Sequence, residues 1–288
     1  MKILLAGASG MIGSAVTPYL TSQGHEVHRL IRRKPGAGEI YWDPEAGQID
    51  NFGLEGFDGV VHLASMPWPM RWTTKTKELI YNNRISTNSL LAKALAGCQR
   101  KPEVLVCASG MGIYPDSGDQ VLTEDSPVGT DFLAHFQCDG EAATTPASTA
   151  GIRVVNLRIP GVLGGESLKR NMGRMGSGRQ WTSWISRDEL AHIIEYVLMK
   201  DSLRGPVNPV SPNPVPNAEF SATLSSLLGR KPGLPMPAFL LRLILGEMAE
   251  ALILASRRIV PARLLTEGYS FLFPNLEDAI YHEAGITV

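Results

Sequence analysis

Three evenly spaced glycines near the start of the chain constrain its fold more than any other feature. The stretch LLAGASGMIGSAV (residues 4–16) places Gly7, Gly10 and Gly13 between an apolar run and a segment with helical patterning. In a strand–turn–helix unit, such glycines permit the tight turn, the approach of a pyrophosphate and close helix–strand packing. A glycine-rich turn that binds nothing is the alternative. The strands expected on either side favour dinucleotide binding.

Apolar runs alternate with helical patterns through the first two-thirds of the chain. Strands are expected at 2–7, 25–31, 59–64, 104–109 and 152–159, and helices at 11–24, 74–97 and 131–143. Continuous Val/Ile/Leu runs alternating with helices are typical of a parallel sheet covered on both faces. We therefore predict an α/β fold with a Rossmann-type, doubly wound parallel sheet.

The composition changes after about residue 204. Five prolines lie within 204–217, and proline disfavours both helix interiors and central strands, so an extended connector is expected there. Helical patterns follow at 218–229, 238–255 and 261–267. We predict a Rossmann domain over 1–204, with part of a substrate cleft at 160–190. A small, mostly helical substrate or cap lobe is predicted over 205–288.

Charge and cysteine content exclude several classes of protein. The 27 basic and 28 acidic residues leave a net charge of −1, which argues against a nucleic-acid-coating protein. Cys98, Cys107 and Cys138 lack metal-ligand spacing, so no metal site is predicted, and their usage indicates a reducing, cytoplasmic location. No apolar run approaches the ~20 residues of a membrane helix. The expected partner is a small-molecule substrate, and the oligomeric state stays open.

The residues after the second expected strand indicate which dinucleotide binds. Ile31 stands where an NAD enzyme usually has Asp or Glu for the ribose hydroxyl, and Arg32, Arg33 and Lys34 follow. A guanidinium can bind a 2′-phosphate through charge-assisted hydrogen bonds. The cluster therefore favours NADP(H), with Arg32 as the expected contact and Arg33 as its substitute. A basic loop that only faces water is the alternative.

Further motifs resemble a known family. GASGMIG, VVHLAS and TNSLLAKAL resemble the extended short-chain dehydrogenase/reductases. YWDPEAGQID, GSGRQWTSWI and LLGEMAEALILASRRIVPARLL narrow the resemblance to an atypical, epimerase-like branch. Its members are often labelled NAD-dependent or nucleoside-diphosphate-sugar epimerases and carry a C-terminal domain of unassigned function. The resemblance implies a Rossmann core, NADP(H) and a substrate lobe at the C-terminal end.

The resemblance also implies which residues bind the cofactor. The diphosphate would be lined by the turn residues Gly7, Ser9, Gly10, Met11, Ile12 and Gly13. The adenosine would be bordered by Leu63 and Ala64, at the end of the third expected strand. Arg84 would approach the cofactor, and Pro160 would lie near its nicotinamide.

The catalytic pair of the superfamily is absent. Short-chain dehydrogenases usually carry a Tyr and, one helical turn later, a Lys that lowers the tyrosine pKa. Here these positions fall on Leu133 and Gln137. The chain also departs from the branch that it resembles, with Gly140 in place of that branch's usual Trp and Ser186 in place of its usual His.

Ser109 and Tyr114, in the stretch CASGMGIYPDSGD, are the remaining catalytic candidates. Ser109 would orient a substrate carbonyl and Tyr114 would donate a proton to it. Asp116 and Asp119 would raise the tyrosine pKa. The alternative is that Tyr114 is an ordinary residue of the wall.

Two tryptophans beside an arginine form a further candidate site. Trp181 and Trp184, next to Arg179, would form an aromatic wall for a sugar or nucleotide, or a hydrophobic anchor between lobes. His62, within a strand, is expected to be a core residue.

Two hypotheses of function follow. The first is an NADP(H)-dependent, epimerase-like oxidoreductase that acts on a polar carbonyl or hydroxyl compound, or on a nucleotide sugar. The second is a non-catalytic NADPH-binding scaffold or redox sensor, which the missing Tyr–Lys pair favours.

Overall fold

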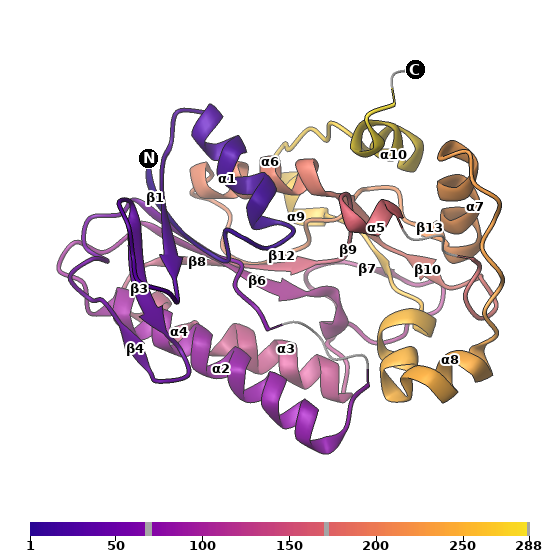
Figure 1. The fold of residues 1–288 in the computed structure, drawn as a ribbon, viewed down its shortest axis with the longest axis horizontal. Coiled ribbons are helices and arrows are strands. Elements are labelled where there is room, and N and C mark those ends of the chain that lie inside the picture. The colour runs from indigo at the N-terminus through magenta and orange to yellow at the C-terminus, as the bar shows by residue number, and fades with distance from the viewer. Residues whose placement is uncertain (67–70, 170–172, 287–288) are drawn as a thin grey trace.

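A mostly parallel sheet forms the centre of the molecule. The structure, a computed structural model, describes residues 1–66, 71–169 and 173–286. The eight strands of the main sheet lie in the order β12–β8–β6–β5–β1–β2–β3–β4, and every pair is parallel except β3 with β4 (Figure 1). In chain order the strands are β1 (Lys2–Ala6), β2 (Glu26–Ile31), β3 (Glu39–Asp43), β4 (Gln48–Ile49), β5 (Gly59–His62), β6 (Val104–Gly110), β8 (Arg153–Ile159) and β12 (Gly205–Val207).

Helices cover both faces of this sheet, as Figure 1 shows. On one face lie α1 (Gly13–Ser22) and α6 (Arg187–Met199). On the other lie α2 (Thr74–Ala96), α3 (Phe132–Ala142) and α4 (Thr145–Thr149). A reciprocal pair of hydrogen bonds between Thr73 and Thr76 caps the start of α2. The predicted fold class is confirmed.

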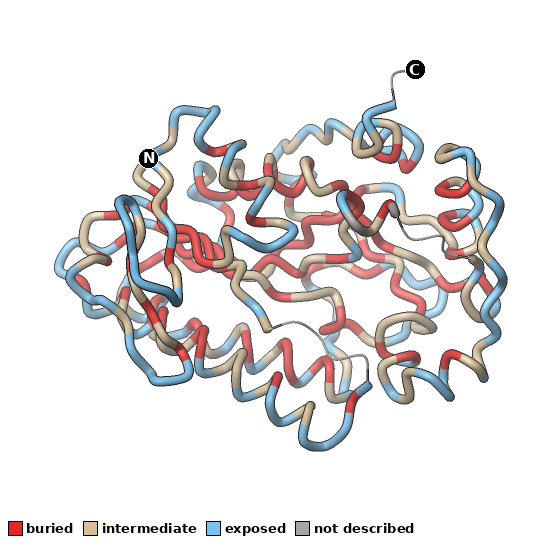
Figure 2. Tube along the Cα trace, viewed as in Figure 1, coloured by how far each residue is buried: buried red, intermediate tan, exposed pale blue. Residues whose placement is uncertain are grey.

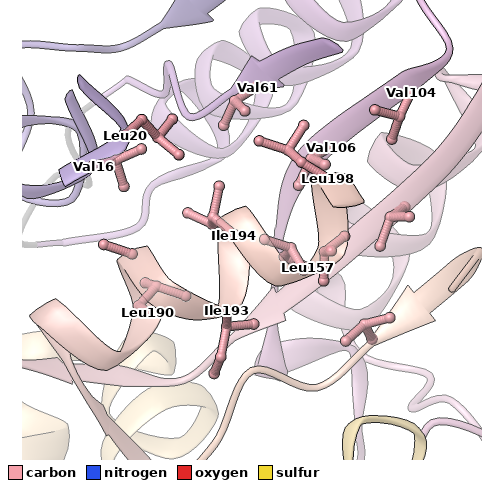
Figure 3. Packing of buried hydrophobic residues seen from close by; sticks show 14 of the residues in the cluster. Val16, Leu20, Val61, Val104, Val106, Leu157, Leu190, Ile193, Ile194 and Leu198 are labelled. Atoms are coloured by element: carbon pink, nitrogen blue, oxygen red, sulfur yellow. The ribbon is translucent and has the colours of Figure 1, made fainter. Parts of the chain in front are cut away.

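The face under α1 and α6 holds the larger apolar cluster. Figure 3 shows Val61, Val106 and Leu157 of the sheet directed toward Ile194 of α6, with Leu20 of α1 nearby. All five side chains are fully buried, and the buried segments concentrate in the central strands (Figure 2). These continuous apolar strands are those of a sheet with no solvent-exposed face.

The remaining elements follow or flank this core, mostly toward the C-terminus. They are η1 (Met111–Ile113), β7 (Val121–Leu122), β9 (Gly161–Leu163), α5 (Glu166–Lys169), β10 (Trp181–Thr182), β11 (Trp184–Ser186), β13 (Val215–Pro216), α7 (Asn217–Leu227), α8 (Ala238–Leu245), the π-helix η2 (Ala249–Leu254), β14 (Arg258–Ile259), α9 (Ala262–Thr266) and α10 (Leu276–Ala284). The helical C-terminal region matches the prediction in character.

One local expectation was wrong, and a second is refined. The single helix expected over 238–255 is divided at Gly246, which has φ +61° and therefore cannot continue α8. The connector expected over 204–217 contains β12, which pairs with β8 at the edge of the sheet. An edge strand tolerates Pro206, because the missing N–H faces no further strand.

The five strands expected from the sequence are all present, within a few residues of their expected ends. The short strands β3 and β4 and the helices α6 and α10 had not been predicted. In the described parts of the chain, no helix has both the length and the apolar character needed to cross a membrane.

Candidate functional site

A cavity of about 1330 Å³ opens at the carboxyl ends of β1, β2 and β5. This edge of a doubly wound sheet is where such folds bind ligands. The predicted cofactor residues that line the cavity are Gly7, Ser9, Gly10, Arg32, Leu63 and Ala64. These six predicted residues therefore lie on the cavity wall, and their roles in binding a cofactor stay predictions.

Two of the three glycines are required by the protein's own packing. Gly7 has φ +87°, and a Cβ there would lie 2.6 Å from the backbone nitrogen of Ala64. A Cβ at Gly13, the first residue of α1, would lie 2.1 Å from the carbonyl oxygen of Gly7. Any side chain at either position would collide with backbone, so the turn and the start of α1 both depend on glycine.

Gly10 differs from its neighbours in this respect. Its φ is not in the left-handed region, and an added Cβ would meet only the Gly7 oxygen, at 3.4 Å. The protein itself has room for a side chain there, and Gly10 lines the cavity. A ligand that approaches the backbone closely is the physical reason for a glycine at this point. Met11 and Ile12, which lead into α1, are not among the lining residues.

Positive side chains gather where β2 ends. Arg29, Arg32 and Arg33 all line the cavity. Arg33 forms a two-pronged ion pair with Glu39, with N–O distances of 2.8 and 2.6 Å. Within the described residues, Arg32 is exposed and has neither an ion pair nor a side-chain hydrogen bond. Arg32 is therefore available to an anion, whereas Arg33 is already neutralised.

Arg84 of α2 carries a second uncompensated charge. It donates hydrogen bonds to the Ala108 carbonyl oxygen (3.1 Å) and the Ser65 hydroxyl (3.4 Å), and Ser65 lines the cavity. No carboxylate of the described residues forms an ion pair with it, and burial lowers its pKa. A half-buried guanidinium that has no carboxylate partner among these residues is costly, and an anionic ligand would offset that cost. Pro160 is buried after β8 and does not line the cavity.

The two catalytic candidates belong to one buried polar network. Ser109 donates to Glu141 at 2.7 Å, and Glu141 forms a bidentate pair with Arg158 at 3.0 and 3.1 Å. Arg158 in turn donates to the Tyr114 hydroxyl at 2.9 Å, which donates to Asn208 at 2.8 Å. The structure thus links Ser109 to Tyr114 through charged groups rather than by direct contact.

Tyr114 is 0 % exposed. Its pKa is raised, as expected, but the cause is burial rather than the two aspartates. Asp119 accepts a hydrogen bond from Trp181, and Asp116 accepts one from the Ser256 amide. The proton-donor role of Tyr114 stays a prediction, and the fully enclosed hydroxyl favours the alternative of a structural residue.

The positions that usually carry the catalytic Tyr and Lys are buried in α3. Leu133 packs in a cluster with Phe136 and Trp72, and Gln137 lies 3.4 Å from the Ser109 hydroxyl. Ser186, where a His is usual, caps α6 by accepting a hydrogen bond from the Glu189 amide at 2.9 Å. Helix capping is therefore a structural reason for a serine at this position.

The two tryptophans have different surroundings. Trp184 is almost fully buried among Phe220, Leu224 and their neighbours, which fits the hydrophobic anchor. Trp181 is half-buried and stacks against Arg258 at 4.2 Å, rather than against Arg179. They therefore do not form one aromatic wall.

His62, at the end of β5, is a buried core residue, as expected. Burial, with the charge of Arg84 as a smaller cause, lowers its pKa to about 3. Within the described residues, no group of three or more His, Cys, Asp and Glu side chains is arranged to hold a metal ion.

Several lining residues had not been identified from the sequence. They come from the outer face of α1, from β2 and β3, and from α2: Thr17, Thr21, Arg29, Glu39, Trp42, Asn83 and Thr87. Helical spacing from the glycine turn could have identified Thr17 and Thr21. Glu39 and Trp42 reach the cavity because β3 pairs with β2, and no sequence motif predicted that pairing.

Comparisons with known proteins identify relatives that share this sequence and fold. The NAD dependent epimerase/dehydratase family matches residues 3–207, and a domain of unknown function, DUF1731, matches residues 236–283. The alignment with the epimerase family protein SDR39U1 of Homo sapiens has 33% identity over a length of 293 positions, and it covers 97% of this chain and 98% of that protein. The alignment with epimerase family protein Mb2239 of Mycobacterium bovis has 35% identity over a length of 290 positions, and it covers 96% of each chain.

Solved structures are similar over the same length. The crystal structure of human SDR39U1 (isoform 2) with NADPH has a TM-score of 0.89 and 32% identity, and covers 99% of both chains. The nucleoside-diphosphate sugar epimerase from Corynebacterium glutamicum has a TM-score of 0.82 and 34% identity, over 99% of this chain and 58% of the other. The glycine turn, the sheet and the C-terminal region are therefore those of a shared family, and this chain belongs to the NAD dependent epimerase/dehydratase family, in the SDR39U1-like group with a C-terminal DUF1731.

Proposed function

We propose that this chain binds NADP(H) and acts as an atypical, epimerase-like short-chain dehydrogenase/reductase. The observation that carries the proposal is Arg32, a guanidinium on the cavity wall beside the glycine turn that forms no ion pair with any described residue. The usual carboxylate of an NAD site is absent from this position, so the site suits a cofactor with an additional phosphate.

The lining residues fit the parts of such a cofactor. The backbone at Gly7–Gly10 and the start of α1 would hold the diphosphate, because Gly10 has no side chain to block its approach and the helix terminus is positive. Leu63, Ala64 and Thr87 would border the adenosine. Arg84 would supply the charge that balances a nearby phosphate. The human relative whose structure contains NADPH supports the same assignment.

NADP(H) would supply a hydride donor or acceptor to the reaction, and this chain's own residues would bind and orient it. The substrate that we propose is a polar carbonyl or hydroxyl compound, with a nucleotide sugar as one member of that class. The name of the Corynebacterium relative, a nucleoside-diphosphate sugar epimerase, supports that class.

A second candidate function is a non-catalytic NADPH-binding scaffold or redox sensor. The observations that favour it are Leu133 and Gln137 in place of the usual pair, and the fully buried Tyr114. The two functions can be separated by NADPH oxidation with a panel of aldehydes, ketones and nucleotide sugars, with wild type beside Tyr114→Phe. Turnover that the variant loses supports the enzyme, whereas intact NADPH binding without turnover of any compound supports the scaffold.

Arg32→Ala tests the cofactor assignment. Because a charge-assisted pair to the 2′-phosphate is lost, we expect NADPH affinity to fall about 10- to 100-fold while NADH affinity changes less than about threefold. Lys34→Ala is the matched control, since it removes a charge from the same loop but not from the cavity wall. Calorimetric titration measures both affinities. Equal losses for NADPH and NADH in Arg32→Ala would contradict the assignment.

A further inference from the structure

Glu39, the first residue of β3, places a carboxylate among the arginines of the cavity wall. Both of its oxygens accept hydrogen bonds from the guanidinium of Arg33, at 2.8 and 2.6 Å. The Glu39 side chain is 11% exposed, whereas that of Arg33 is 67% exposed. The carboxylate is therefore a mostly buried part of the wall, and it pairs with an arginine whose side chain is largely exposed.

The backbone fixes Glu39 in this position. The Gly36 amide donates to the Glu39 carboxylate at 3.0 Å, and the Glu39 amide donates to the Gly36 carbonyl oxygen at 3.2 Å. The Arg29 amide donates to Gly38 at 3.0 Å and ties the same turn to β2. The Gly36 hydrogen bond, followed by the Arg33 pair, lowers the pKa of Glu39, so the carboxylate is ionised at neutral pH.

This arrangement changes the charge that a ligand meets. Arg29, Arg32 and Arg33 all line the cavity, and Glu39 cancels one of these charges. A carboxylate near a 2′-phosphate repels it, and it also keeps Arg33 from turning toward the phosphate. Without Glu39, the same wall would offer a third free guanidinium.

We propose that Glu39 is a specificity-determining residue of the cofactor site, which limits the preference for NADP(H) over NAD(H) by pairing with Arg33. The proposal rests on the proposed function, because it assumes that a 2′-phosphate binds beside Arg32. It adds that the strength of selection is set by a residue on β3 as well as by the loop after β2.

Glu39→Gln is the direct test. Glutamine keeps a carbonyl oxygen that can accept from the Gly36 amide, so the turn is retained while the negative charge is removed. We expect the ratio of NADPH to NADH affinity to rise about three- to tenfold. Glu45→Gln is the matched control, because Glu45 lines the same cavity but pairs with no arginine among the described residues. Its ratio should stay within about twofold of wild type.

Arg33→Met completes a double-mutant cycle. Alone, it leaves the Glu39 carboxylate unpaired beside the phosphate, so the affinity ratio should fall about three- to tenfold. The double variant with Glu39→Gln restores the wild-type net charge of the wall and should return the ratio to near the wild-type value. Circular dichroism of each variant checks that the fold is retained.

The outcomes separate this proposal from the one on which it rests. A higher ratio in Glu39→Gln that is absent in Glu45→Gln, together with recovery in the double variant, supports the role of Glu39. An unchanged or lower ratio in Glu39→Gln, or the same rise in both single glutamine variants, overturns it while wild type still prefers NADPH. A wild-type protein that binds NADPH and NADH equally overturns the proposed function and this proposal with it.

Discussion

The three glycines of the first turn differ in how much room their surroundings leave for a side chain. Gly7 and Gly13 have no room for a Cβ because backbone atoms of Ala64 and Gly7 lie against them, whereas Gly10 has room on the protein side. The shared sequence motif therefore combines two requirements of the fold with one requirement of a ligand, and substitution can separate them.

Gly10→Ala should weaken NADPH binding by about tenfold or more, because the methyl group would occupy the approach to the diphosphate, while the free energy of unfolding changes by less than about 1 kcal/mol. Gly13→Ala should instead lower the free energy of unfolding by about 2 kcal/mol or more, because of the backbone collision. Calorimetry and urea denaturation measure the two effects. A stable Gly10→Ala protein with wild-type NADPH affinity would show that no ligand approaches this backbone.

His62 predicts a pH dependence of stability. Burial depresses its pKa to about 3, so the unfolded state binds more protons than the folded state between about pH 6.5 and pH 3. Its contribution to stability is therefore complete above pH 6.5 and is lost as the pH falls through this window. Between pH 7 and pH 5, the free energy of unfolding measured by urea denaturation should fall by roughly 1 to 2 kcal/mol less in His62→Leu than in wild type. Identical losses in the two proteins would show that His62 is not buried in its neutral form.

At this scale, local motifs predicted the lining residues that follow strand ends, such as Gly7, Arg32 and Ala64. They could not predict that Arg33 forms an ion pair, because its partner Glu39 is brought close by the pairing of β3 with β2. Nor could they predict that Tyr114 is enclosed, because Arg158 and Asn208 reach it from distant strands and loops.

Among the secondary-structure elements, hydrophobic patterning identified the buried strands but not every helix boundary. The apolar pattern runs on through Gly246, yet α8 ends there and η2 begins three residues later. A glycine with positive φ ends a helix whatever the hydrophobicity of its neighbours. The strands β4 and β12 have two and three residues, which are too few to show a pattern. β3 is as long as β1, but its sequence EIYWD is not a continuous apolar run.

Gly246→Ala tests this helix boundary. Apart from the glycine and its chain neighbours, no atom of the described residues lies within 4 Å of the position of an added Cβ, so any cost is that of placing alanine at φ +61°. We expect the free energy of unfolding to fall by about 1 to 2 kcal/mol. Gly97→Ala, at the end of α2 with φ −82°, is the control and should be neutral or slightly stabilising. Equal effects at both positions would contradict the assigned conformation of Gly246.

In the molecule as a whole, the sequence predicted the doubly wound sheet, because buried parallel strands and helices leave strong periodic signals. It could not show how the C-terminal region joins that sheet. β12 extends the sheet beside β8, and Leu264 of α9 is fully buried in the same core cluster as α1 and α6. The division near residue 204 stays a prediction, and these contacts tie residues on either side of it together.

The cavity, the glycine turn and the arginines all depend on this sheet order, because it places the ends of β1, β2 and β5 side by side. Calorimetric titration of the unmodified chain with NADPH and with NADH measures both affinities and so tests the cavity, the glycine turn and the arginines together. We expect NADPH to bind at least about tenfold more tightly, with a difference that shrinks as salt is raised because charges select the cofactor. Equal affinities for the two cofactors, or no heat of binding with NADPH, would contradict a phosphate held by the glycine turn and Arg32.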